Sequence, residues 1–128
     1  MIFFNVNKNI DELSEIKFFD NVQAIQKNAD FSGLKILNFN YQDLGKYSEI
    51  SNLAVEVSEI KNFLFLAKTN TNYAICDKKN AQKFQKLAEE YLLDIKILVK
   101  IETEDEIEEV AKNFIDGVIK ISKNLKPN

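Results

Sequence analysis

The sequence contains no histidine and no arginine, and all 17 of its basic residues are lysine. Without histidine the chain lacks a side chain that titrates near neutral pH, a base for a serine or cysteine nucleophile, and an imidazole ligand for a metal. Without arginine it lacks the planar group that binds carboxylates and phosphates through two hydrogen bonds. Because the usual catalytic groups are missing, the composition favours a protein that is not an enzyme.

Glycine is also scarce, with Gly33, Gly45 and Gly117 scattered along the chain. Neither the dinucleotide-binding pattern nor the P-loop pattern occurs, and both need several glycines close together. We therefore expect no nucleotide cofactor.

The single cysteine, Cys76, excludes an internal disulfide and favours a reducing compartment. The N-terminus has no basic segment followed by an apolar run, and no stretch approaches the roughly 20 apolar residues that span a bilayer. The net charge of −3 and the pI of about 5.1 argue against a nucleic-acid partner. We expect a cytoplasmic protein that binds neither membranes nor nucleic acid.

Strand and helix patterns alternate along the 128 residues, a length that suits one domain with a short polar tail from about residue 123. Strands are expected at 2–6, 34–39, 53–57, 73–76, 95–101 and 118–121, and helices near 10–29, 43–50, 60–67, 81–92 and 107–114. This alternation predicts an α/β fold with a mostly parallel sheet. The sheet is either open, with helices on both faces in three layers, or curled into a partial barrel, since a complete eight-stranded barrel needs about 200 residues.

Residues 10–30 fit more than one interpretation. Val22, Ile25 and Ala29 have helical spacing, whereas the segment from Ile16 to Phe19 also suits a strand. One broken helix and two short helices both stay open.

Capping residues mark the expected helix starts. Ser58 precedes one helix, and Asp77 or Asn80 precedes the next. Thr103 and Glu106 form a capping-box pattern, in which the Thr103 hydroxyl accepts from the Glu106 N–H and the Glu106 carboxylate accepts from the Thr103 N–H.

The helix expected at 60–67 carries a continuous apolar run from Phe63 to Leu66. Either this helix is buried on more than one side, or part of it contacts another chain. A homodimer would also cover the edges of an open sheet. The leading hypothesis is therefore a homo-oligomeric domain that acts through protein contacts, which Phe63→Asp or Leu66→Asp would disrupt.

Polar residues follow the expected strands at the carboxyl ends, where parallel sheets bind ligands. They are Asn5, Asn7, Asn38, Asn40, Glu56, Ser58, Asp77, Lys100, Glu102, Lys120 and Ser122. If their strands are neighbours, Glu56, Asp77 and Glu102 provide three carboxylates for Mg²⁺. Lys100 among them would act as acid, base or phosphate anchor, which suits an enzyme or binding protein for a small phosphorylated ligand. Alternatively, Asp77 caps a helix, Glu56 is an exposed residue at a strand end, and Glu102 is part of an acidic helix start.

Cys76 is a second candidate, because a thiol beside Lys78 and Lys79 could be reactive. No histidine is available as its base, so a small buried hydrophobic residue is the favoured interpretation.

Residues 99–102 (Val-Lys-Ile-Glu), an acidic helix and residues 116–119 (Asp-Gly-Val-Ile) resemble the pyruvate kinase pattern, in which a Lys-Ile-Glu strand end precedes a helix and an Asp-Gly-Ile strand. The βα units here are similar to those of phosphate-binding (βα)8-barrel enzymes. The resemblance implies that Lys100 assists phosphoryl transfer and that Glu102 binds a divalent metal. It covers about 25 residues and lacks the family's following arginine and glycine-rich elements, so it implies βα architecture rather than activity.

Overall fold

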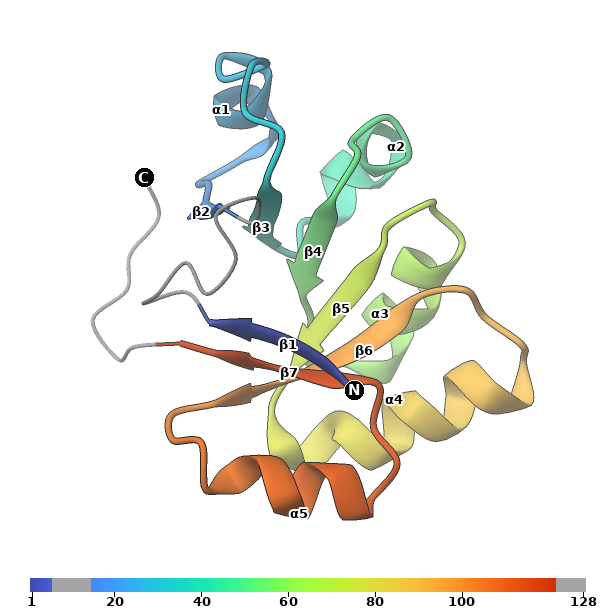
Figure 1. The fold of residues 1–128 in the computed structure, drawn as a ribbon. Coiled ribbons are helices and arrows are strands. Elements are labelled where there is room, and N and C mark those ends of the chain that lie inside the picture. The colour runs from blue at the N-terminus through green and yellow to red at the C-terminus, as the bar shows by residue number, and fades with distance from the viewer. Residues whose placement is uncertain (6–14, 122–128) are drawn as a thin grey trace.

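The computed structural model describes residues 1–5 and 15–121 (Figure 1). The described strands are β1 (Ile2–Asn5), β2 (Ile16–Phe18), β3 (Leu34–Asn38), β4 (Leu53–Glu56), β5 (Tyr73–Cys76), β6 (Lys96–Ile101) and β7 (Gly117–Lys120). The described α-helices are α1 (Val22–Gln26), α2 (Leu44–Tyr47), α3 (Ile60–Ala67), α4 (Lys78–Glu90) and α5 (Glu106–Lys112), and a 3₁₀ helix (Tyr41–Asp43) precedes α2. The predicted α/β class is confirmed, while the expected polar tail lies outside the described residues.

The strands form one sheet in the order β1-β7-β6-β5-β4-β3-β2, and every neighbouring pair is parallel. From β2 to β7 each strand lies beside its predecessor in the chain, and β1 is added at the far edge beside β7. The carboxyl ends of all these strands therefore share one edge of the sheet.

All the described α-helices cover the same face of this sheet. Buried side chains from every described α-helix belong to a single core cluster, among them Val22, Tyr47, Phe63, Phe84 and Val110. The core on the other face contains strand and strand-end residues alone. The alternative with helices on both faces is therefore wrong, and Figure 1 shows the helices on the outside of a half-barrel.

A ring contact across the inner face demonstrates the curl of the sheet. Phe4 on β1 and Tyr73 on β5 lie three strand spacings apart in the sheet order, which is about 14 Å in a flat sheet. Their ring centroids are 5.4 Å apart, in an edge-to-face arrangement. The partial-barrel alternative is thus confirmed.

The concave face of the half-barrel is packed with aliphatic side chains. Its buried members are Leu34, Ile36, Ala54, Ile75, Leu98 and Ile119. Because both faces of the central strands are buried, these strands have continuous apolar sequences rather than alternating ones. Toward the carboxyl edge, Glu56 and Lys100 follow Ala54 and Leu98 on the same face of the sheet.

The segment 15–30 contains a strand and a short helix. Ile16–Phe18 forms β2 at the edge beside β3, so the strand interpretation is correct and the interpretation of this stretch as helix is wrong. Asn21 is the N-cap of α1, and its side chain accepts a hydrogen bond from the backbone N–H of Ala24 at 2.8 Å. The part of the expected helix at 10–14 lies outside the described residues.

The capping predictions are partly confirmed. Asp77 is the N-cap of α4, although its side chain makes no capping hydrogen bond, and Glu59 rather than Ser58 is the N-cap of α3. The Glu106 carboxylate accepts from the Thr103 N–H at 2.8 Å, as predicted. The Glu106 N–H, however, donates to the Thr103 carbonyl at 3.2 Å rather than to the hydroxyl.

The apolar run on α3 is explained by burial within the chain. Phe63 and Leu66 are 0% exposed and face the sheet, so the prediction that they form a dimer surface is wrong. On another side of the helix, the Phe65 ring packs against Tyr41 with centroids 5.4 Å apart. The interpretation of a helix buried on more than one side is therefore correct.

Gly117 permits the close approach of β1 to β7. A Cβ atom at this position would lie 2.5 Å from the Ile2 carbonyl oxygen, so the paired strand would have to move. We expect Gly117→Ala to lower the free energy of unfolding by about 1–2 kcal/mol, measured by urea denaturation. Gly45→Ala is the control, because its added Cβ meets nothing within 4 Å. An equal loss in both variants would contradict this account.

Candidate functional site

Three charged side chains from neighbouring strands meet at the carboxyl edge of the half-barrel. Lys100 on β6 forms ion pairs with Glu56, the last residue of β4, and with Asp77, which follows β5. The distance from Lys100 Nζ to Asp77 Oδ1 is 3.2 Å, and Nζ also donates to Glu56 Oε1. Lys100 lies two residues beyond Leu98 and therefore on the same, concave face. Of the four residues expected to converge, Glu56, Asp77 and Lys100 therefore meet.

Lys100 is held as an ammonium group. Its side chain is 32% exposed, and those of Glu56 and Asp77 are 28% and 50% exposed. Burial alone would lower the pKa of Lys100, but the hydrogen bonds and charges of Glu56 and Asp77 outweigh burial and raise this pKa. A lysine in this state donates hydrogen bonds rather than accepting a proton, so the geometry favours an anchoring role.

Glu102 belongs to a different set of contacts. Its backbone N–H donates to the Glu106 carboxylate at 2.7 Å, at the start of α5. Across residues 1–5 and 15–121, no group of three or more cysteine, aspartate or glutamate side chains is placed to hold a metal ion. The structure thus combines Glu56 and Asp77 with the Lys100 cation rather than with a third carboxylate. The catalytic role of Lys100 and Glu102 stays a prediction.

Two pockets adjoin the ion cluster, one on each side of Asp77. The first, which we call the β4 pocket, has a volume of about 280 Å³, and its lining includes Asn38, Phe39, Glu56, Ser58, Asn62 and Asp77. The second, the β6 pocket, has a volume of about 490 Å³, and its lining includes Asp77, Lys78, Lys79, Lys100, Glu102 and Glu106. The residues predicted from the strand ends therefore surround two hollows at one edge.

The remaining strand-end residues have local structural roles or lie elsewhere. The Asn40 side chain caps the 3₁₀ helix by accepting a hydrogen bond from the backbone two residues later, at 3.1 Å. Asn5 is buried at the end of β1, and Lys120 pairs with a carboxylate that follows β6. Asn7 and Ser122 lie outside the described residues.

Cys76 is a buried hydrophobic residue, as the favoured interpretation predicted. It is 1% exposed and belongs to the core between sheet and helices. Burial, reinforced by the charge of Asp77, raises the pKa of the thiol to about 12. The thiol is therefore protonated at neutral pH and unsuited to nucleophilic attack.

Sequence analysis missed two residues of the β4 pocket. Phe39 follows β3, and Asn62 projects from the first turn of α3. Asparagine is a poor helix former, and its place just before the apolar run from Phe63 was the available signal for Asn62.

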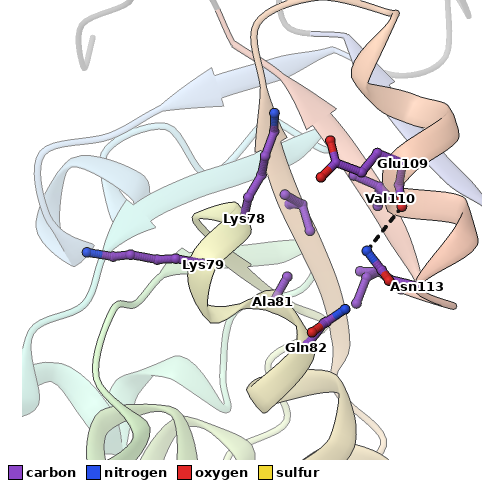
Figure 2. Close-up of a pocket in the computed structure, with 9 residues that line it drawn as sticks. Lys78, Lys79, Ala81, Gln82, Glu109, Val110 and Asn113 are labelled. Carbon is purple, nitrogen blue, oxygen red and sulfur yellow. Dashed lines mark hydrogen bonds between the residues drawn. The ribbon is translucent and has the colours of Figure 1, made fainter.

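A further groove of about 260 Å³ lies between α4 and α5. Figure 2 shows Lys78 and Glu109 extending from the two helices, while Lys79 points away from them. Asn113 donates to the Glu109 carbonyl at 3.2 Å, and Lys78 pairs with the Glu106 carboxylate. The Lys78–Glu106 pair joins α4 to α5, and the Asn113 bond lies within the end of α5, so the groove is part of the contact between these helices rather than a candidate site.

The contacts of Glu106 make the stability of this region depend on pH. The hydrogen bond from Lys78, followed by that from the Thr103 backbone, lowers the pKa of Glu106 from 4.5 to about 2. Because the folded-state pKa is depressed, the stabilisation is complete above pH 4.5 and is lost as pH falls toward 2.

We therefore expect Glu106→Ala to destabilise the protein by about 1 kcal/mol at pH 7, as loss of a cap does. The difference from wild type should shrink between pH 4.5 and 2, measured by chemical denaturation at each pH. The control is Glu90→Ala, which removes an exposed pair with Lys86 and should show little difference at any pH. A pH-independent effect of Glu106→Ala would contradict the account.

In the described part of the chain, no helix has the length and apolar character needed to cross a lipid bilayer. Comparison of the chain with models of protein families, with curated proteins and with solved structures finds no match to any of them.

Proposed function

We propose that this protein binds a small metabolite at the carboxyl edge of its half-barrel and does not transform it chemically. The supporting observation is the meeting of Lys100, Glu56 and Asp77 beside two pockets. In curled parallel sheets this edge is where ligands bind, because loops and helix starts surround it. The apolar run on α3, which had favoured a protein-contact role, is core instead.

The proposal that the protein is non-catalytic rests on the state of its ionisable groups. Lys100 is paired with two carboxylates, and Cys76 is buried with a raised pKa. The sequence has no histidine to act as a general base near neutral pH.

The alternative within this proposal is a phosphorylated ligand, with or without Mg²⁺, in the β6 pocket. Lys78, Lys79 and Lys100 line this pocket together with Asp77 and Glu102, so it offers both cations for a phosphate and oxygen ligands for a metal. In this case Lys100 anchors the phosphate, and Glu102 has the role of metal ligand that the likeness to pyruvate kinase implies.

A thermal-shift screen tests the binding function. Metabolites, with and without phosphate groups and Mg²⁺, are added to the wild type and to Glu56→Gln and Asp77→Asn variants. A bound ligand raises the melting temperature of the wild type, and this rise is lost or reduced in both variants. Glu108→Gln, at an exposed helix position paired with Lys112, is the control and keeps the full rise. No rise with any compound, or equal rises in all proteins, would contradict the proposal.

Self-association is the second candidate, in a protein that we place in the cytoplasm. Leu92 and Phe114 follow α4 and α5 and are 87% and 83% exposed. Both have left-handed backbones, with φ of 52° and 58°, although glycine or asparagine is the usual choice there. Two bulky apolar side chains in such positions favour contact with a second copy of the chain.

Light scattering coupled to size exclusion tests this candidate. The wild type should elute as a dimer, and Leu92→Asn with Phe114→Asn should elute as a monomer, since asparagine tolerates the left-handed backbone. A monomeric wild type would refute self-association and leave the ligand-binding proposal unaffected.

A further inference from the structure

The β4 pocket contains polar side chains that have no hydrogen-bond partner among the described residues. Asn38, at the end of β3, and Asn62, on α3, line it from two elements, and Ser58 lies between β4 and α3. Within residues 1–5 and 15–121, the side chains of these three residues make no hydrogen bond. Two amides and a hydroxyl therefore line one hollow of about 280 Å³ with their donors and acceptors available.

The charge of this pocket disfavours an anion. Glu56 and Asp77 both line it, while Lys100, which pairs with both, lines the other pocket. The cluster carries one positive and two negative charges, so its net charge is −1. A phosphate here would face two carboxylates, and the ammonium group that could attract it is already engaged.

The hydrogen-bond donors and acceptors that line the β4 pocket suit a ligand rich in hydroxyl groups. Carboxylates only accept, whereas amides and hydroxyls both donate and accept. A sugar hydroxyl also does both, so adjacent hydroxyls can donate to Glu56 and Asp77 and exchange hydrogen bonds with Asn38 and Asn62. The partly buried ring of Phe39 supplies an apolar wall for the C–H face of such a ligand.

We propose that the β4 pocket binds a neutral polyhydroxy compound of monosaccharide size. This inference rests on the proposed binding function and deepens it by naming the ligand class. The pocket volume is near the lower end of the range for ligand pockets, which limits the ligand to about the size of a monosaccharide. The net negative charge and the unpaired amides favour a neutral ligand with many hydroxyl groups. Lys78, Lys79 and Lys100 line the β6 pocket, on the other side of Asp77, and are not part of the proposed sugar site.

Isothermal titration calorimetry with D-glucose, D-ribose and myo-inositol tests the proposal, beside glucose 6-phosphate and inorganic phosphate. At least one neutral compound should bind to the wild type. Asn38→Ala and Asn62→Ala should each weaken that binding about tenfold, because each removes an unshared hydrogen-bonding amide. Asn70→Ala, at an exposed position outside the pocket, is the matched control and should bind as the wild type does.

The outcomes separate this inference from the function on which it rests. Binding of glucose 6-phosphate without binding of any neutral compound would overturn the ligand class and leave the binding function standing. Binding of a neutral compound that both asparagine variants retain would overturn the assignment to the β4 pocket. If no probe binds, the ligand class is overturned, and the binding function falls as well only if the metabolite screen also shows no rise in melting temperature.

Discussion

Replacing Lys100 with methionine is expected to lower the free energy of unfolding by about 2–3 kcal/mol at pH 7. Methionine keeps most of the apolar stem of the lysine side chain and removes its charge. Glu56 and Asp77 then face each other at the edge of the concave core without the cation that now lies between them. Because all three side chains are partly exposed, the loss should stay below that of a fully buried pair. Urea denaturation of the variant measures it.

Two controls isolate the cause. Lys112→Met removes an exposed helix-surface ion pair with Glu108 and should change the stability by less than about 0.5 kcal/mol. The double variant Lys100→Met with Glu56→Gln should recover a large part of the loss, since a single carboxylate then lies at the site. A double variant that is less stable than Lys100→Met alone would show that carboxylate repulsion is not the cause.

Replacing Phe63 with alanine is expected to lower the free energy of unfolding by about 3–5 kcal/mol. The Phe63 ring is fully buried and stacks on Phe84 at 4.6 Å with an interplanar angle of 6°. Removing the ring leaves a cavity between α3, α4 and the sheet, and the apolar surface of the ring is no longer buried. Thermal and urea denaturation measure the effect.

The control for Phe63→Ala is Ile60→Ala on the same helix, where the side chain is 43% exposed. This variant should lose clearly less stability than Phe63→Ala, because less surface is buried at position 60. A small effect of Phe63→Ala, accompanied by a change in oligomeric state, would instead indicate that the apolar run contacts another chain.

The fold class could be predicted because each unit carries its own local pattern. Helical spacing in α4 and the apolar segment of β6 identify a βα repeat without tertiary information. The curl could not be predicted, because it depends on contacts such as that of Phe4 with Tyr73, which are distant in the sequence. The sequence does not decide between strand and helix at β2, because three residues are too few to show a period.

The candidate site could be predicted in part for a similar reason. Glu56, Asp77 and Lys100 lie at or just beyond strand ends, and parallel strands bring their carboxyl ends to one edge. Glu102 was grouped with them by sequence position, but β6 ends at Ile101 and the following turn places its backbone in the start of α5. Asn62 was missed because it comes from a helix, and only the packing of α3 brings it to the pocket.

Nuclear magnetic resonance tests the location of the binding site most directly. A ¹H–¹⁵N correlation spectrum is recorded while the neutral compound that binds most tightly is added to the isotope-labelled protein. The account predicts that the largest shifts occur in the side-chain amides of Asn38 and Asn62 and in the backbone signals of Glu56 and Asp77. Shifts concentrated instead around Leu92 and Phe114, at the opposite edge of the sheet, would contradict it.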